Sequence, residues 1–168
     1  MLLGLKLLCI LLVSISMALA LAHALELPGK LRLEKKDYLT VQEIYYPGFT
    51  VGGFAEVLGL LALAGLLYFI PIDNPSFKWT LASFIALAAL HATYWILTHP
   101  TNKFWLQNKN LKGTGAVFFE SGSASTEKGQ GMDENLWKRY RNRWEASHVI
   151  RAVLGVGSLM FLAYAIAL

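Results

Sequence analysis

Long apolar segments separated by polar connections dominate the chain. Residues 2–25, 51–72, 79–98 and 148–168 each form a nearly continuous hydrophobic run. About 20 apolar residues in a helix span the hydrocarbon core of a bilayer. The pattern therefore predicts an all-α integral membrane protein in which residues 1–168 form one four-helix bundle.

The polar connections differ in what they predict. Between the first two runs, Asp37 is suited to cap a short helix whose Tyr38, Val41 and Tyr45 share one face, which is typical of a helix lying in the membrane interface. Residues 72–75 predict a tight turn. The Ser- and Gly-rich residues 120–131 predict a partly flexible polar connection before the fourth helix. Helical spacing resumes at Asp133, so the fourth helix is expected to begin well before its apolar part.

Composition and charge support a membrane location. The chain of 168 residues is 55% hydrophobic with a mean hydropathy of +0.46, which is too apolar for an ordinary soluble domain. The apolar run around Ala18 and Ala20 is longer than a usual signal core, so we interpret it as a retained span. Cys9 is the single cysteine, which excludes an intrachain disulfide.

The distribution of Lys and Arg predicts the orientation. The first and third connections carry twelve of these residues, and the opposite side carries only Lys6 and Lys78. The positive-inside rule then places both long connections in the cytoplasm and the protein in the inner (plasma) membrane. The net charge of +4 fits anionic membrane lipid as a partner, and no motif indicates nucleic acid.

Ionisable residues gather where the four apolar runs end on the cytoplasmic side. Such groups at membrane depth cost several kcal/mol unless they face a partner or a cavity, so they indicate a site. His91 is the strongest candidate, because it lies about two turns inside the third run. Asn102 falls near the same helical stripe, although Pro100 is expected to end or kink the helix before it. The candidates are His23, Glu26, Glu56, His91, Glu145, His148 and Arg151.

Two spacings suggest metal ligands. Glu145 and His148 have the Glu-x-x-His spacing found at metal sites in helical bundles, and His23 and Glu26 repeat it in reverse. The candidate metal ligands are His23, Glu26, Glu56, His91, Glu145 and His148, for iron, manganese or copper, or for haem through two histidines.

A purely structural interpretation stays open for part of the set. Arg151 reaching Glu56 or Glu26 would be an ion pair that fixes the helix register. For His99 and Glu43 we favour the structural role.

The tryptophans divide into two groups. Trp79, Trp105, Trp137 and Trp144 lie near predicted membrane surfaces, where aromatic residues commonly act as anchors. Trp95 lies inside the third run on the His91 side, where it can stack on a planar ligand. Trp95 and Trp144 are the candidates for contact with a cofactor.

Four stretches carry a family resemblance: HALELPGK at residues 23–30, IYYPGFT at 44–50, THPTNKFW at 98–105 and RWEASHVIRA at 143–152. They resemble a family of small four-helix bacterial membrane proteins of unknown function that is related to the anthrone oxygenases of polyketide pathways. The resemblance implies a four-helix membrane fold. For the anthrone oxygenase branch it implies oxidation of an electron-rich aromatic ring by dioxygen without an established cofactor. The residues that match are His23, Glu26, Asn102, Trp144, Glu145, His148 and Arg151.

Three functions follow as hypotheses. The first is an oxygenase or oxidoreductase acting on a lipophilic aromatic or quinone-like substrate, with His91 or His148 as the base and with Arg151 and Asn102 stabilising the enolate oxygen. This chemistry requires no metal. The second is a metal- or haem-binding membrane protein. The third is a non-catalytic subunit of a larger membrane complex.

Overall fold

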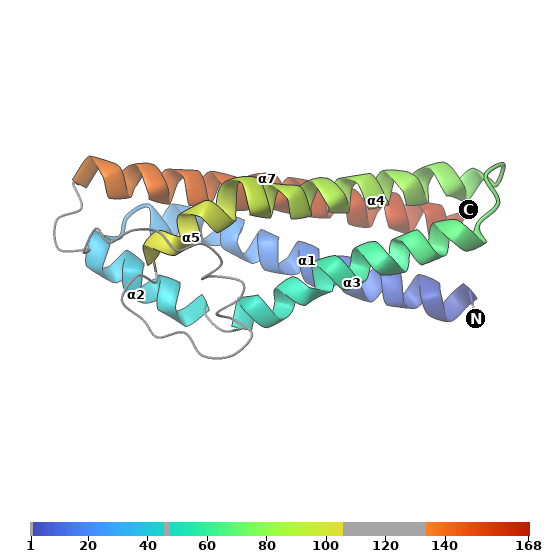
Figure 1. Ribbon diagram of the computed structural model, residues 1–168, viewed down its shortest axis with the longest axis horizontal. Coiled ribbons are helices and arrows are strands. Elements are labelled where there is room, and N and C mark those ends of the chain that lie inside the picture. The colour runs from blue at the N-terminus through green and yellow to red at the C-terminus, as the bar shows by residue number, and fades with distance from the viewer. Residues whose placement is uncertain (1, 46–47, 106–133) are drawn as a thin grey trace.

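The computed structural model describes residues 2–45, 48–105 and 134–168, and every element in these ranges is a helix (Figure 1). The all-α prediction is therefore confirmed for the described part of the chain. The elements are α1 (Leu2–Lys30), α2 (Lys35–Tyr45), α3 (Gly48–Phe69), α4 (Pro75–Thr93), the π-helix η1 (Tyr94–Thr98), α5 (His99–Trp105) and α7 (Glu134–Ala167). The predicted flexible connection, residues 120–131, lies outside the described residues.

Four of the helical stretches are long and apolar enough to cross a membrane: Leu2–Lys30, Gly52–Phe69, Pro75–Asn102 and Glu134–Ala167. They coincide with the four predicted runs and extend beyond three of them. The longest, α7, begins at Glu134, which confirms that the fourth helix starts well before its apolar part.

The four long helices form a ring of neighbours. Both α1 and α4 pack against α3 and α7, so α3 and α7 lie on one diagonal of the bundle and α1 and α4 on the other. Both chain termini lie at one end, and α2 lies at the opposite end (Figure 1).

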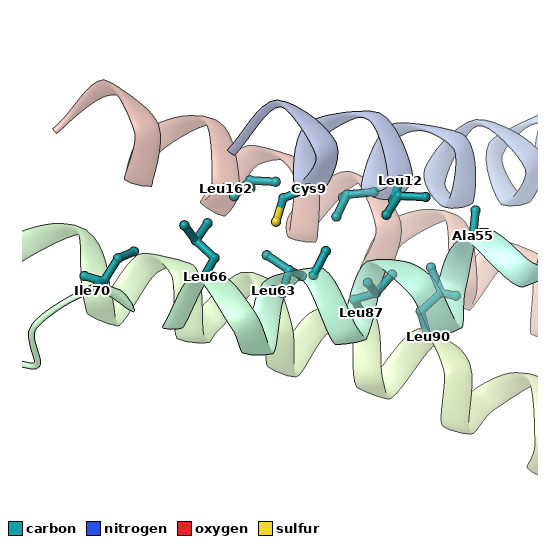
Figure 2. Close-up of a cluster of buried hydrophobic side chains, with 11 residues drawn as sticks. Cys9, Leu12, Ala55, Leu63, Leu66, Ile70, Leu87, Leu90 and Leu162 are labelled. Atoms are coloured by element: carbon teal, nitrogen blue, oxygen red, sulfur yellow. The ribbon is translucent and has the colours of Figure 1, made fainter. Parts of the chain in front are cut away.

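Each long helix contributes leucines to the apolar core (Figure 2). Leu12 of α1, Leu63 of α3, Leu87 of α4 and Leu162 of α7 are all buried in one cluster. Gly155 lets α7 approach α1 closely, because a Cβ atom there would lie 3.0 Å from the Met17 Cα. Small residues at such contacts are typical of helices that associate in membranes.

Hydrogen bonds between small polar side chains add to the contact of α4 with α7. The Ser158 hydroxyl donates to the Ser83 carbonyl at 2.9 Å, and the two hydroxyl oxygens lie 3.0 Å apart. Since the Ser158 proton is used on the carbonyl, the Ser83 hydroxyl donates to Ser158. Both residues are buried, so this pair fixes the register of the two helices.

The connections confirm one prediction and correct two. Asn74 caps α4 by accepting a hydrogen bond from the Ser76 backbone N–H at 2.9 Å, as expected for a tight turn. The α2 helix begins at Lys35, so Asp37 lies in its first turn and is not its cap. Of the two effects predicted for Pro100, ending or kinking the helix, the first does not occur, because η1 and α5 continue the helix to Trp105.

Two features let the helix pass through Pro100. Proline has no N–H to donate to the carbonyl four residues earlier, which is that of Ile96. Arg143 of α7 donates to this carbonyl at 2.8 Å in its place. The π-helix Tyr94–Thr98 ends two residues before the proline, and π-helical turns are frequent at functional sites.

Candidate functional site

A buried polar cluster lies between the apolar core and the α2 end of the bundle. It joins side chains from α1, α3, α4 and α7, and we call it the polar cluster: His23, Glu26, Lys30, Glu56, His91, Glu145, His148 and Arg151. Every sequence-predicted histidine and carboxylate of the site is included. All of them are buried except Glu26, which is exposed, and His91, which is partly buried.

An ion pair crosses the centre of the polar cluster. The Arg151 guanidinium of α7 donates to the Glu56 carboxylate of α3, the helix diagonally opposite. Both side chains are buried, and the guanidinium carbon lies 5.5 Å from the centre of the Tyr94 ring. The sequence suggested Glu56 or Glu26 as the partner of Arg151, and in the structure the partner is Glu56.

The hydrogen bonds of His91 determine its protonation. The Trp95 indole N–H donates to His91 Nε2 at 3.0 Å, so that nitrogen carries a lone pair. The other nitrogen, Nδ1, lies 3.1 Å from Glu56 Oε2 and therefore donates a proton to the carboxylate. His91 is thus a neutral imidazole oriented by a carboxylate, with Nε2 available as a base whenever Trp95 moves away.

Trp95 stands at the outer edge of this arrangement. It is the second residue of η1 and remains 44% exposed, beside the more exposed Ile96. Its ring also packs against the His99 ring, with ring centroids 4.8 Å apart. His91 Nε2 is therefore bonded to a side chain that is itself half exposed.

His148 is held in the same tautomer by a different contact. Its Nδ1 lies 2.9 Å from the Trp144 carbonyl, which can only accept, so Nδ1 carries the proton. Its Nε2 faces the Arg151 guanidinium at 3.4 Å. The Ser147 hydroxyl donates to the same Trp144 carbonyl at 2.6 Å and lies 2.8 Å from the Thr98 hydroxyl, which fastens this turn of α7 to η1.

His23 lies among aromatic rings. Its ring centroid is 4.4 Å from that of His148, 4.4 Å from that of Tyr45, 4.2 Å from that of Phe49 and 5.0 Å from that of Trp144. Its Nδ1 has no hydrogen-bond partner and lies 3.8 Å from Glu26 Oε2.

Lys30 joins the two outer carboxylates of the polar cluster. Its Nζ lies 2.9 Å from Glu145 Oε2 and 3.8 Å from Glu26 Oε2. Two tyrosines of α2 complete this group, since Tyr38 donates to Glu145 at 2.8 Å and Tyr45 donates to Glu26. Burial and the neighbouring carboxylates raise the pKa of both tyrosines well above the usual value.

The tryptophans and Asn102 take roles that the sequence did not predict. Trp144 and Trp137 are buried inside the protein, so the prediction that they anchor the protein at the membrane surface is wrong. The Trp144 indole N–H donates to Asn102 Oδ1 at 3.0 Å. Asn102 therefore orients the ring that packs against both His23 and His148.

Among the described residues, no group could hold a metal ion, and His23 and His148 lie too close together for a haem between them. The described ranges contain no group of three or more His, Cys, Asp and Glu side chains arranged to hold a metal ion. The Lys30 ammonium lies 3.8 Å from Glu26 and 2.9 Å from Glu145, and Arg151 binds Glu56, so cations of the protein itself are already paired with these three carboxylates. The His23 and His148 rings are in direct edge contact, which leaves no space between them for a porphyrin.

Sequence reasoning missed Lys30, Tyr38 and Tyr45. Lys30 was counted only among the cytoplasmic charges, yet it is 3% exposed and is bound to two carboxylates. One signal was present: Lys30 follows Glu26 by four residues, a spacing at which opposite charges meet on a helix. The two tyrosines lie far from their partners along the chain, so spacing gave no sign of the contacts.

Comparisons with protein-family models, with curated proteins and with solved structures find no match to this chain.

Proposed function

We propose that the protein crosses a membrane four times, with the polar cluster and the long connections on the cytoplasmic side. The large apolar side chains that remain exposed support this placement, because they lie along the long helices: Leu7, Leu61, Val153 and Met160 are each more than half exposed. In water such surfaces would promote aggregation, whereas in a bilayer they contact lipid.

Within this placement, we propose that the polar cluster is the active site of an oxidoreductase or oxygenase acting on a lipophilic aromatic substrate. One observation carries the proposal: Glu56 orients a neutral His91 whose Nε2 points toward the half-exposed Trp95. A base oriented by a third group is an arrangement common in general-base catalysis. The aromatic substrate class is the one that the family resemblance implies.

The proposed reaction begins when the substrate takes the place of the Trp95 indole at His91 Nε2. His91 then accepts the proton of an acidic C–H or O–H group, and Glu56 stabilises the resulting imidazolium. The Arg151 Nε–H group has no hydrogen-bond partner within the protein, so it can donate to the substrate oxygen. The carbanion or phenolate transfers electrons to dioxygen, so that a ring CH2 and O2 give a ring carbonyl and water.

Oxygen uptake with anthrone as the probe substrate tests this function. Protein in lipid nanodiscs should consume dioxygen and form anthraquinone faster than empty nanodiscs. His91→Phe, which keeps a ring and removes the base, should lower the rate by about 10² or more. Trp79→Phe, at the opposite end of the bundle, is the control and should keep the parental rate. Equal rates for parent protein, His91→Phe and empty nanodiscs would contradict the proposal.

A further inference from the structure

One face of α7 changes from cationic to apolar along the helix. Its residues follow one another at three- and four-residue spacing, and we call them the outer stripe: Arg139, Arg143, Ala146, Ile150 and Val153. All five are exposed, Ile150 by 44% and Val153 by 68%. Each residue adds about 1.5 Å to a helix, so Arg143 lies roughly 10 Å along the axis from Ile150. The outer stripe therefore joins a charged surface to an apolar one over about two turns.

A hydrogen bond to the third span holds Arg143 in place. One N–H of its Nη2 donates to the Ile96 carbonyl at 2.8 Å, and the Ile96 side chain beside it is 63% exposed. A guanidinium group has five N–H donors, so the other four can bind a ligand outside the protein. Arg143 therefore presents an oriented guanidinium next to an exposed apolar side chain of the neighbouring helix.

The two arginines of the outer stripe have no acidic partner among the described residues. Glu134 pairs with a lysine one turn further along α7, and Glu145 is buried and pairs with Lys30. These are the only acidic side chains of α7, and no ion pair within the described ranges includes Arg139 or Arg143. Like charges four residues apart on a helix repel each other. An anion bound by both arginines would therefore neutralise a charge that the protein leaves unbalanced.

We propose that the outer stripe binds an anionic phospholipid, with its phosphate at Arg139 and Arg143 and an acyl chain along Ala146, Ile150 and Val153. Guanidinium groups bind phosphate oxygens through two parallel hydrogen bonds. A soluble anion would use the arginines alone, whereas a phospholipid matches both parts of the stripe. A zwitterionic headgroup fits less well, because its ammonium group would lie beside two arginines. The site rests on the proposed membrane placement and is independent of the polar cluster and its chemistry.

Native mass spectrometry of the detergent-solubilised protein tests the proposal, with phosphatidylglycerol and phosphatidylcholine of the same acyl chains as the added lipids. The parent protein should bind its first phosphatidylglycerol roughly 10-fold or more tightly than its first phosphatidylcholine. Arg139→Gln should weaken phosphatidylglycerol binding by about 5-fold and leave phosphatidylcholine binding unchanged. Replacing Arg143 by Gln as well should remove the preference. Because Arg143 also bonds to Ile96, the Arg139→Gln variant alone decides the outcome if the double variant does not fold.

The matched control replaces Arg32 and Lys36 by Gln, two exposed cations at the α2 end of the bundle, and should keep the parental preference within about 2-fold. Glycerophosphoglycerol, the same headgroup without acyl chains, should not displace phosphatidylglycerol. Equal binding of the two lipids by the parent would overturn the proposal, as would an equal effect of Arg139→Gln and the control, or displacement by the headgroup alone. If the parent bound neither lipid, the membrane placement would fail with it.

Discussion

Arg151 of α7 binds Glu56 of α3 across the diagonal of the bundle, although the two residues lie 95 positions apart. The pair is buried between helices that otherwise contact each other through their neighbours α1 and α4. It therefore joins the two parts of the polar cluster, with His91 bonded to Glu56 and His148 beside Arg151.

Removing one member of this pair should be far more harmful than removing both. Glu56→Leu alone leaves a buried unpaired guanidinium, so we expect a loss of about 3–5 kcal/mol of unfolding free energy. Arg151→Met alone should cost a similar amount. The double variant, with both charges replaced by apolar groups, should recover most of the loss. Unfolding of the four proteins in detergent measures this, and single variants within about 0.5 kcal/mol of the parent would contradict it.

Two glycines on α7 allow a matched test of the contact between α1 and α7, because only one of them lies at that contact. An alanine Cβ at position 155 would lie 3.0 Å from the Met17 Cα, a backbone atom that cannot move aside. Gly155→Ala should therefore destabilise the protein by about 1–3 kcal/mol. A Cβ at Gly157 meets nothing within 4 Å, so Gly157→Ala should stabilise the helix by up to about 1 kcal/mol. Equal melting temperatures for the two variants would show that α1 and α7 do not approach closely at Gly155.

The passage of the third span through Pro100 can be tested by a double-mutant cycle. Arg143→Leu leaves the Ile96 carbonyl without its donor and should cost about 1 kcal/mol. In a Pro100→Ala background, the restored N–H at position 100 can bond to Ile96, so the same change should cost much less. An unchanged cost in both backgrounds would mean that Arg143 and Pro100 act independently.

The sequence predicted the helices well because their apolar runs are long enough to dominate local preferences. It also placed the ionisable residues at one end of the bundle, since antiparallel helices bring the end of one run beside the start of the next. It did not predict the partners. Lys30 looked like one of many connection charges, and only the packing of α1 against α7 brings it to Glu145. The same packing buries Trp144, whose position near a helix end had suggested a membrane anchor.

The predicted metal site shows why spacing alone was insufficient. The Glu-x-x-His spacing does place Glu145 and His148 on one face of α7, but spacing within one helix cannot show which charge arrives from another. Here Lys30 comes from α1 to bind Glu145, while Arg151 of α7 itself lies beside His148. They take up the carboxylates and the imidazole that a metal would have required.

High pH should weaken the attachment of α2, since tyrosine must be protonated to donate to Glu26 or Glu145. Burial raises the pKa of Tyr38 and Tyr45 in the folded protein above the value near 10 of an unfolded tyrosine. Their contribution to stability is therefore complete below about pH 10 and is lost progressively as the pH rises above it. Melting temperatures of the parent and the Tyr38→Phe, Tyr45→Phe double variant, measured from about pH 8 to 11, should differ most at the lower end and converge toward the upper end. A constant difference across the range would show that these two hydroxyls do not titrate with folding.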